Sequence, residues 1–180
     1  EIQYTIELSN LRPGDGTGQS AACTYQVWAD NLIDGGGWDD PSFAIGAGGP
    51  DGTYAVGLFT GNSDILEGDT FNFTSPTGNI TSVEAVYSLY IGGTKPLGDD
   101  VIRGEVYTST NPLSDTTFSN TVINANYVGP ANQGLLSWDI TTVKANWQFS
   151  DFANLGVAMD VQKKNSTDGA TLHLDSLGFL

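Results

Sequence analysis

The chain has 180 residues, of which 39% are hydrophobic and only 15% are charged, so it can form one domain with a substantial core. Its formal net charge of −15 at pH 7 argues against nucleic acid and anionic membranes as partners, because both require a basic surface. No run of about 18 apolar residues occurs, so we expect no membrane insertion.

A single cysteine and a single histidine limit the available chemistry. Cys23 cannot form an intramolecular disulfide, and its alternating surroundings predict a small buried hydrophobe. His173 lies between Leu172 and Leu174, so it should point away from them, as a surface or edge histidine rather than a metal ligand or a base. We therefore expect neither a transition-metal site nor a cysteine nucleophile.

Two features favour an extracellular or particle-surface location. Asparagines at positions 72, 79 and 165 begin N-x-S/T sequons, which are weak indicators in a chain rich in asparagine and threonine. The chain begins with Glu1 rather than methionine, from which we expect that an earlier segment is removed.

Alternation of apolar and polar residues predicts about nine or ten strands. The segments are residues 1–9, 22–28, 53–60, 69–74, 80–91, 101–108, 121–127, 134–138, 155–163 and 170–180. Turn signals separate them every 8 to 12 residues, which is typical of an antiparallel sandwich or barrel. We predict an all-β, antiparallel, two-sheet sandwich of jelly-roll type that forms a single domain over residues 1–180.

Two segments depart from this pattern. Residues 111–120 are polar and are predicted to be irregular. Residues 139–147 are the one helix candidate, because Asp139 or Thr141 can cap it and Val143 and Trp147 lie four residues apart.

The longest predicted strand, residues 80–91, should be covered on both faces. Its inward set is Val83, Ala85, Tyr87 and Leu89. Val86 and Tyr90 are also apolar and lie on the other face, so partial cover is expected there too.

The segment from residue 30 to residue 55 is acidic, rich in glycine and free of basic residues, which predicts a long ordered loop. Within this segment, a span of 22 residues contains five of its aspartates, namely Asp30, Asp34, Asp39, Asp40 and Asp51. Calcium takes 6–8 oxygen ligands and tolerates irregular loops, so these residues are a candidate calcium site. The alternative is that each aspartate caps a turn through its own backbone. A second acidic candidate joins Asp99 and Asp100 with Asp175.

Aromatic residues supply the alternative function, carbohydrate binding by stacking on sugar rings. The candidates are Trp38, Tyr54, Trp138 and Trp147, within a larger set that includes Trp28, Tyr87, Tyr90 and Tyr107. The competing interpretation is core and interface packing.

Carboxylate pairs of the glycosidase type are not evident. Glutamates are few, and Glu84 and Glu105 lie in predicted strands, where we expect them to face solvent. We therefore predict that the protein is not an enzyme.

The first predicted strand bears on assembly. Its apolar set is Ile2, Tyr4, Ile6 and Leu8. A terminal strand either pairs within its own sandwich or adds to the sheet of a neighbouring subunit, which would build an oligomer or filament.

Short motifs in a fixed order carry a family resemblance. They are Trp38-x-x-Pro41-x-x-Ala44, Pro50-Asp51-Gly52-x-Tyr54-Ala55, Pro76-x-Gly78-x-Ile80-x-x-Val83 and Asn154-Leu155-Gly156-Val157. Together they resemble a loose family of extracellular and virion β-sandwich modules, although Asp40 stands where that family often has asparagine. The resemblance implies a binding or structural module without a fixed catalytic set.

Two further similarities are shorter. Residues 8–15, LSNLRPGD, are similar to a stretch of secreted biofilm-fibre subunits. Trp138-Asp139-Ile140-Thr141, with Trp147, resembles a step in some bacterial cell-surface sandwiches. The sequence thus predicts a non-enzymatic structural or adhesive subunit that binds copies of itself on a filament, virion or cell surface, with calcium as a candidate stabiliser. The alternative is a carbohydrate-binding module of the same fold.

Overall fold

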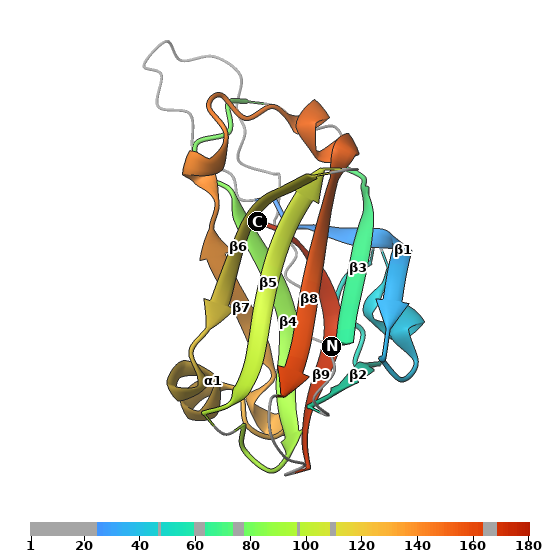
Figure 1. Cartoon of the computed structure of the whole chain (residues 1–180). Helices are drawn as coiled ribbons and strands as arrows, with labels where there is room; N and C mark the ends of the chain where they lie inside the picture. Colours follow the sequence, from blue (N-terminus) through green and yellow to red (C-terminus); the bar gives the residue numbers. More distant parts are fainter. Residues whose placement is uncertain are drawn as a thin grey trace, which may run out of the picture.

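The computed structural model describes residues 25–46, 48–59, 64–73, 78–96, 98–108, 111–163 and 169–180. It shows a two-layer β-sandwich in which all the named strands pair antiparallel (Figure 1), so the predicted fold class is confirmed. The strands are β1 (Val27–Gly36), β2 (Ala55–Leu58), β3 (Asp64–Phe71), β4 (Glu84–Gly93), β5 (Asp100–Thr108), β6 (Asn111–Phe118), β7 (Gly134–Asp139), β8 (Leu155–Lys163) and β9 (Ala170–Phe179). The helical segments are η2 (Pro41–Ala44), α1 (Asn120–Asn126), η3 (Pro130–Asn132), η4 (Thr141–Val143) and η5 (Phe149–Asn154).

Strand β1 connects the two layers. The front sheet, nearest the viewer in Figure 1, has the order β6-β5-β8-β3-β1. The back sheet contains β9, which pairs with β4, with β2 and with the first residues of β1, and β7 extends it beyond β4. Val27 and Trp28 pair with β9, whereas the rest of β1 pairs with β3, so one continuous strand closes this side of the sandwich. On the other side the two sheets end in β6 and β7.

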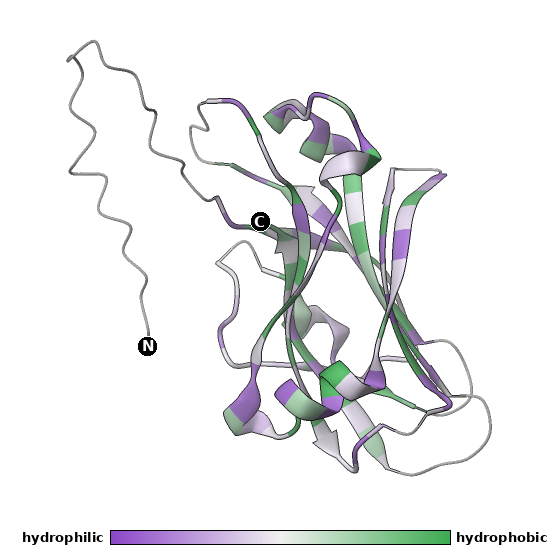
Figure 2. Ribbon diagram, turned by 90° about the vertical axis from the view of Figure 1, so that its left-hand side faces the viewer, coloured by the Kyte–Doolittle hydropathy of each residue, from purple (hydrophilic) through white to green (hydrophobic). Residues whose placement is uncertain are grey.

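The core lies between the sheets and follows from the two-residue period of the strands. Along β5 the buried residues Ile102 and Val106 alternate with half-buried polar ones, and the alternation is visible along the ribbons in Figure 2. Tyr87 on β4 is completely buried, and its hydroxyl donates a hydrogen bond to the carbonyl of Ala158 on β8, 3.0 Å away. The predicted inward set of the long strand is confirmed, because Val83, Ala85, Tyr87 and Leu89 are all buried.

The prediction of one long acidic loop is wrong. Its first residues belong to β1, which extends to Gly36, and η2 forms at Pro41–Ala44. Strand pairing with β3 overrides the local glycine and aspartate content, because the ladder satisfies backbone groups that a loop would leave to water. What remains irregular is short, and residues 48–53 lead directly into β2.

Three local predictions are also wrong. Residues 111–118 form the edge strand β6, whose exposed side chains carry no apolar period to detect. Residues 120–126 form helix α1 instead of a strand, because the Ser119 hydroxyl accepts a hydrogen bond from the Thr121 amide and caps the helix. The expected helix at 139–147 is reduced to η4, where the Asp139 carboxylate accepts a hydrogen bond from the Thr141 amide at 2.7 Å.

Several predictions fall outside the described residues. They include Ile2, Tyr4, Ile6 and Leu8 of the first predicted strand, together with Cys23 and Asn165. Asn72 and Asn79 are described and are exposed. Within the described ranges, the search for a helix long and apolar enough to cross a membrane finds none.

Candidate functional site

The outer face of the back sheet carries a buried carboxylate, Asp175. A register shift occurs where β4 passes β9: Ser88 pairs with Ser176, and Leu89 pairs with Leu174. Asp175 is therefore the extra residue of a β-bulge, a device that redirects a side chain. It is 2% exposed, although it lies on a face that would otherwise meet solvent.

Residues 48–53, which we call the clasp, cover this carboxylate. Asp175 accepts hydrogen bonds from the backbone amides of Asp51 and Gly52, at 2.9 and 3.1 Å. The Gln133 amide donates to the same carboxylate at 2.7 Å. At the other end of the clasp Gly49, with φ 76°, lies so close to the Trp28 indole that a Cβ there would come within 2.4 Å of its Nε1. The clasp therefore accounts for the burial of Trp28 on the outer side of the sheet.

Burial raises the pKa of Asp175, and the hydrogen bonds from Asp51, Gln133 and Gly52 offset only part of that rise. Asp51 behaves in the opposite way. Its carboxylate accepts hydrogen bonds from the Thr53 hydroxyl at 2.6 Å and the Thr53 amide at 2.8 Å, and these lower its pKa. The carboxylates of Asp175 and Asp51 thus have pKa values shifted in opposite directions, although the Asp51 backbone amide is hydrogen-bonded to Asp175.

We expect the stability of the protein relative to Asp175→Asn to fall as the pH rises above about 4, the ordinary pKa of an aspartate. The folded pKa of Asp175 is above its ordinary value, so the folded state retains a proton that the unfolded state releases. That contribution is present at low pH and is lost as the pH rises through the folded pKa, whereas asparagine does not titrate. Chemical unfolding of both proteins across this range measures the difference, and a constant difference would contradict a raised pKa.

Four of the five aspartates of the first calcium candidate have described side chains. Among the described residues, no group of three or more histidine, cysteine, aspartate or glutamate side chains is positioned to hold a metal ion. Asp30 lies on β1, Asp39 bridges to Val56 through its backbone, and Asp40 precedes η2 with φ 49°. Asp51 closes its own turn, and of Asp34 only its backbone position on β1 is described. Calcium binding stays a prediction.

The second acidic candidate is divided between the two sheets. Asp100 is buried at the start of β5 in the front sheet. Asp175 lies in the back sheet, where its carboxylate is engaged by the clasp.

Three of the four selected aromatic residues point inward. Trp38 and Trp147 belong to the core with 6% and 4% exposure, which leaves their ring faces unavailable to a sugar. Trp138 is partly buried and packs against the same core. Tyr54 is half-buried on the outer face of the back sheet, where its hydroxyl donates to Gln133 at 2.6 Å.

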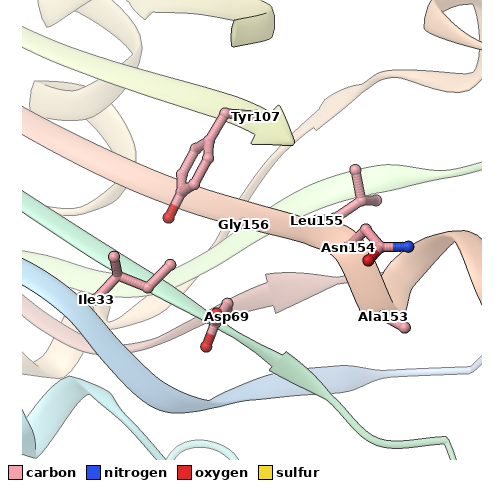
Figure 3. Close-up of a pocket in the computed structure, with 7 residues that line it drawn as sticks. All are labelled: Ile33, Asp69, Tyr107, Ala153, Asn154, Leu155 and Gly156. Atoms are coloured by element: carbon pink, nitrogen blue, oxygen red, sulfur yellow. The ribbon is translucent and has the colours of Figure 1, made fainter. Parts of the chain in front are cut away.

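A cleft of about 120 Å³ crosses the outer face of the front sheet at β8 (Figure 3). It lies along a row of residues directly opposite one another on four strands. Tyr107 of β5 pairs with Gly156 of β8, Gly156 with Asp69 of β3, and Asp69 with Asn31 of β1. Of this row, Tyr107, Gly156 and Asp69 line the cleft, and Ile33, Ala153, Asn154 and Leu155 complete the lining. This row is invisible in the sequence, because its members come from four separate segments.

The floor of the cleft is Gly156, and the Tyr107 ring lies over it. A Cβ on Gly156 would come within 2.1 to 2.4 Å of the Tyr107 ring and its hydroxyl oxygen, so only glycine leaves room for the ring in this position. Ile33 approaches from β1 with 47% of its surface exposed. The cleft therefore combines an aromatic ring and an aliphatic side chain on a small floor.

Polar groups surround the ring. The Asp69 carboxylate accepts hydrogen bonds from the Asn31 amide at 2.8 Å and from the Thr70 hydroxyl at 2.9 Å, which fixes its orientation. Asn154 is exposed at the end of η5. A carboxylate accepts hydrogen bonds from the hydroxyl groups of a ligand, and a side-chain amide both donates hydrogen bonds to them and accepts hydrogen bonds from them.

Two glutamates lie on either side of Ala158, the next outward-facing residue of β8 after Gly156. Glu67 of β3 and Glu105 of β5 both lie opposite Ala158, so their backbones are two strands apart, about 10 Å. Both glutamates are half-buried, and the expectation that the protein is not an enzyme stays a prediction. Glu84 pairs with Asp139 in the other sheet.

The known proteins that are similar to this chain share little of its sequence and only part of its structure. No family model matches the chain, and no curated protein matches it. Among solved structures, the xylan-binding module CBM15 is similar with a TM-score of 0.41 and 11% identity, over 86% of this chain and 88% of that chain. A mutant of Xylanase10C from Cellvibrio japonicus in complex with xylopentaose is similar with a TM-score of 0.39 and 10% identity, over 86% of this chain and 26% of that chain. Similarity this low does not identify the ligand of the present chain, so a functional assignment depends on its own geometry.

Proposed function

We propose that the protein is a non-catalytic carbohydrate-binding module that acts outside the cell or on a particle surface. The observation that carries the proposal is the cross-strand row Tyr107, Gly156, Asp69 and Asn31, which places a ring beside fixed polar groups in an open cleft. Sugar rings offer apolar C–H faces and hydroxyl edges, so they fit a site that has both an aromatic surface and hydrogen-bonding groups.

The charge of the outer face of the front sheet restricts the class of glycan that can bind there. Asp69, Glu67 and Glu105 all point outward on it. Among the side chains that the structure describes on this face, Arg103 is paired with Asp160 at 2.9 Å. An anionic glycan would be repelled by the three outward carboxylates, so the proposed ligand is a neutral polysaccharide.

A structural role for Tyr107 is the competing explanation, because a ring placed over a glycine also covers exposed backbone of the sheet. The two explanations differ in what they predict for ligands. Affinity electrophoresis against soluble arabinoxylan, glucomannan, mixed-linkage β-glucan and polygalacturonate tests binding directly. We expect retardation by at least one neutral polymer, none by polygalacturonate, and no release of reducing ends. Absence of retardation by every neutral polymer would overturn the proposal.

Self-assembly is a second candidate, which the open edge of β7 favours. Among the described strands β7 pairs only with β4, and it has no proline and no charge before Asp139. Leu135 on it is 44% exposed. The edge strand of the front sheet, β6, contains Pro112 and Asp115, which discourage pairing. A strand from a second copy, with Ile2, Tyr4, Ile6 and Leu8 as its apolar set, would add to β7.

Solution mass with and without calcium tests the assembly and calcium hypotheses together. Strand addition predicts a mass above one chain that falls when Ile6→Asp is introduced. Calcium binding predicts a melting temperature that rises with added calcium, since a ligand at a hundred times its Kd stabilises by about 2.7 kcal/mol. A strict monomer that responds neither to calcium nor to chelation would remove both hypotheses and leave carbohydrate binding unaffected.

A further inference from the structure

A second aromatic cluster lies on the outer face of the back sheet, on the opposite side of the sandwich from the Tyr107 cleft. Tyr90 of β4 lies directly opposite His173 of β9, and His173 lies directly opposite Val56 of β2. Tyr54 precedes Val56 by two residues and so lies on the same face. All four side chains are half-buried. We call Tyr54, Tyr90 and His173 the back-face cluster.

The rings of the back-face cluster hold one another in place. Tyr90 and His173 are stacked, with centroids 4.3 Å apart and planes 9° from parallel. The Tyr54 ring is close to perpendicular to both, at 5.1 Å from Tyr90 and 6.0 Å from His173. A ligand that contacts such a cluster has little side-chain entropy left to remove, which favours binding.

Hydrogen bonds fix the cluster further. The Tyr54 hydroxyl donates to Gln133, whose amide group donates to Ser88 at 3.1 Å and to Asp175. The His173 Nε2 lies 3.0 Å from the Thr171 hydroxyl. Tyr54 is thus tied to the buried carboxylate that also holds the clasp.

The charge around the cluster selects against anions. The described side chains that hydrogen-bond to the cluster, Gln133 and Thr171, are uncharged, and Asp51 is exposed at the neighbouring clasp. Burial lowers the pKa of His173, which keeps the ring neutral at neutral pH. Rings without a cation, next to hydroxyl and amide groups, suit the same chemical class of ligand as the front cleft.

We infer that the back-face cluster is a second binding site for neutral polysaccharide, so that one chain binds two glycan strands on opposite faces of the sandwich. The inference rests on the proposed function, because it extends the same ligand class to a second face. Two sites pointing in opposite directions cannot both engage one straight polymer segment. The protein therefore cross-links separate polymers.

The test uses soluble arabinoxylan, glucomannan and mixed-linkage β-glucan with the full chain. The wild-type protein is expected to be retarded in affinity gels and to make polymer solutions turbid. Tyr107→Ala and Tyr90→Leu should each keep about half of the binding stoichiometry but lose turbidity, and the double variant should lose binding by tenfold or more. Tyr54→Ala replaces Tyr90→Leu if the latter does not fold, as judged by its melting curve. Val122→Ala, which changes an exposed apolar residue of α1 outside both binding sites and outside the β7 edge, is the control and should leave turbidity unchanged.

The outcomes separate the two claims. If Tyr107→Ala alone abolishes all binding while the protein stays folded, the second site is wrong and the front cleft stands. If Tyr107→Ala has no effect and Tyr90→Leu abolishes binding, the back face is the one site, and both the front cleft and cross-linking are wrong. If the wild-type protein binds none of the three polymers, the proposed function fails and this inference fails with it.

Discussion

Replacing Asp175 with alanine is expected to lower the free energy of unfolding by about 2–3 kcal/mol. The substitution removes the acceptor for two backbone amides, those of Asp51 and Gly52, and for the Gln133 side chain. All three hydrogen bonds are part-buried, and bonds to a charged acceptor contribute more than bonds between neutral groups. The cost of burying the carboxylate, which is the reason its pKa is raised, offsets part of the loss.

The effect should have a local signature at the clasp. Because Gly49 packs on the Trp28 indole, a loosened clasp should expose this tryptophan and shift its emission to longer wavelength at temperatures below the melting transition. Melting curves should show a decrease of roughly 5–10 °C, as expected for a domain of this size. Asp115→Ala is the matched control, since that carboxylate is exposed on β6, and it should change stability by less than about 0.5 kcal/mol. An unchanged melting temperature for Asp175→Ala would show that the clasp is not held by this carboxylate.

Replacing Tyr107 with alanine is expected to weaken binding of a neutral polysaccharide to the front cleft by tenfold or more. The ring provides the aromatic surface of the cleft, and truncating a central aromatic contact typically costs above 1 kcal/mol of binding free energy. Isothermal titration of Tyr90→Leu, with and without Tyr107→Ala, measures this site without a contribution from the back face. Tyr107→Ala should lower the free energy of unfolding by about 1–2 kcal/mol, less than Asp175→Ala, because Tyr107 is only half-buried.

A second variant, Gly156→Ala, changes the same cleft by displacing the Tyr107 ring. Gly156→Ala keeps the tyrosine but places a methyl group where the ring lies, so the ring must swing away. It should reduce binding as Tyr107→Ala does, although no aromatic residue has been removed. Phe43→Ala is the control, because Phe43 is a 47% exposed aromatic residue on η2, outside the cleft lining. Normal binding by both cleft variants would show that the ring over Gly156 only protects the sheet.

The strands with a clear two-residue period were predictable, because burial on one face selects apolar residues at alternate positions. The ends of β8 match the prediction, the ends of β4, β5 and β9 fall within four residues of it, and His173 points outward as expected. Strand β6 was missed because it is an edge strand with exposed side chains and so shows no such selection. Helix α1 was mistaken for a strand, because its β-branched Val122 and Ile123 favour strands and only the Ser119 cap and the tertiary context decide otherwise.

The candidate site was only partly predictable. Tyr54 was identified as a candidate for sugar contact, and it lies on an outer face. Trp38 and Trp147 were selected for the same chemistry but are buried, because an aromatic residue near a loop gives no local sign of which way it points. Tyr107 and Gly156 are 49 positions apart in the sequence, and only the pairing of β5 with β8 brings them together.

The sequence by itself determined the fold class. Apolar and polar residues alternate, turn signals recur every 8 to 12 residues, and helix-forming residues are scarce, so an antiparallel sandwich is the architecture that buries the apolar faces of the strands. Its net charge of −15 also disfavours polyanionic partners. The tertiary structure decided everything that depends on register. The bulge that turns Asp175 under the clasp, the row that sets Tyr107 over Gly156 and the contact of Tyr90 with His173 all follow from which residue faces which across a pair of strands. Such pairing is a long-range property, fixed when the whole core closes and not by any local segment.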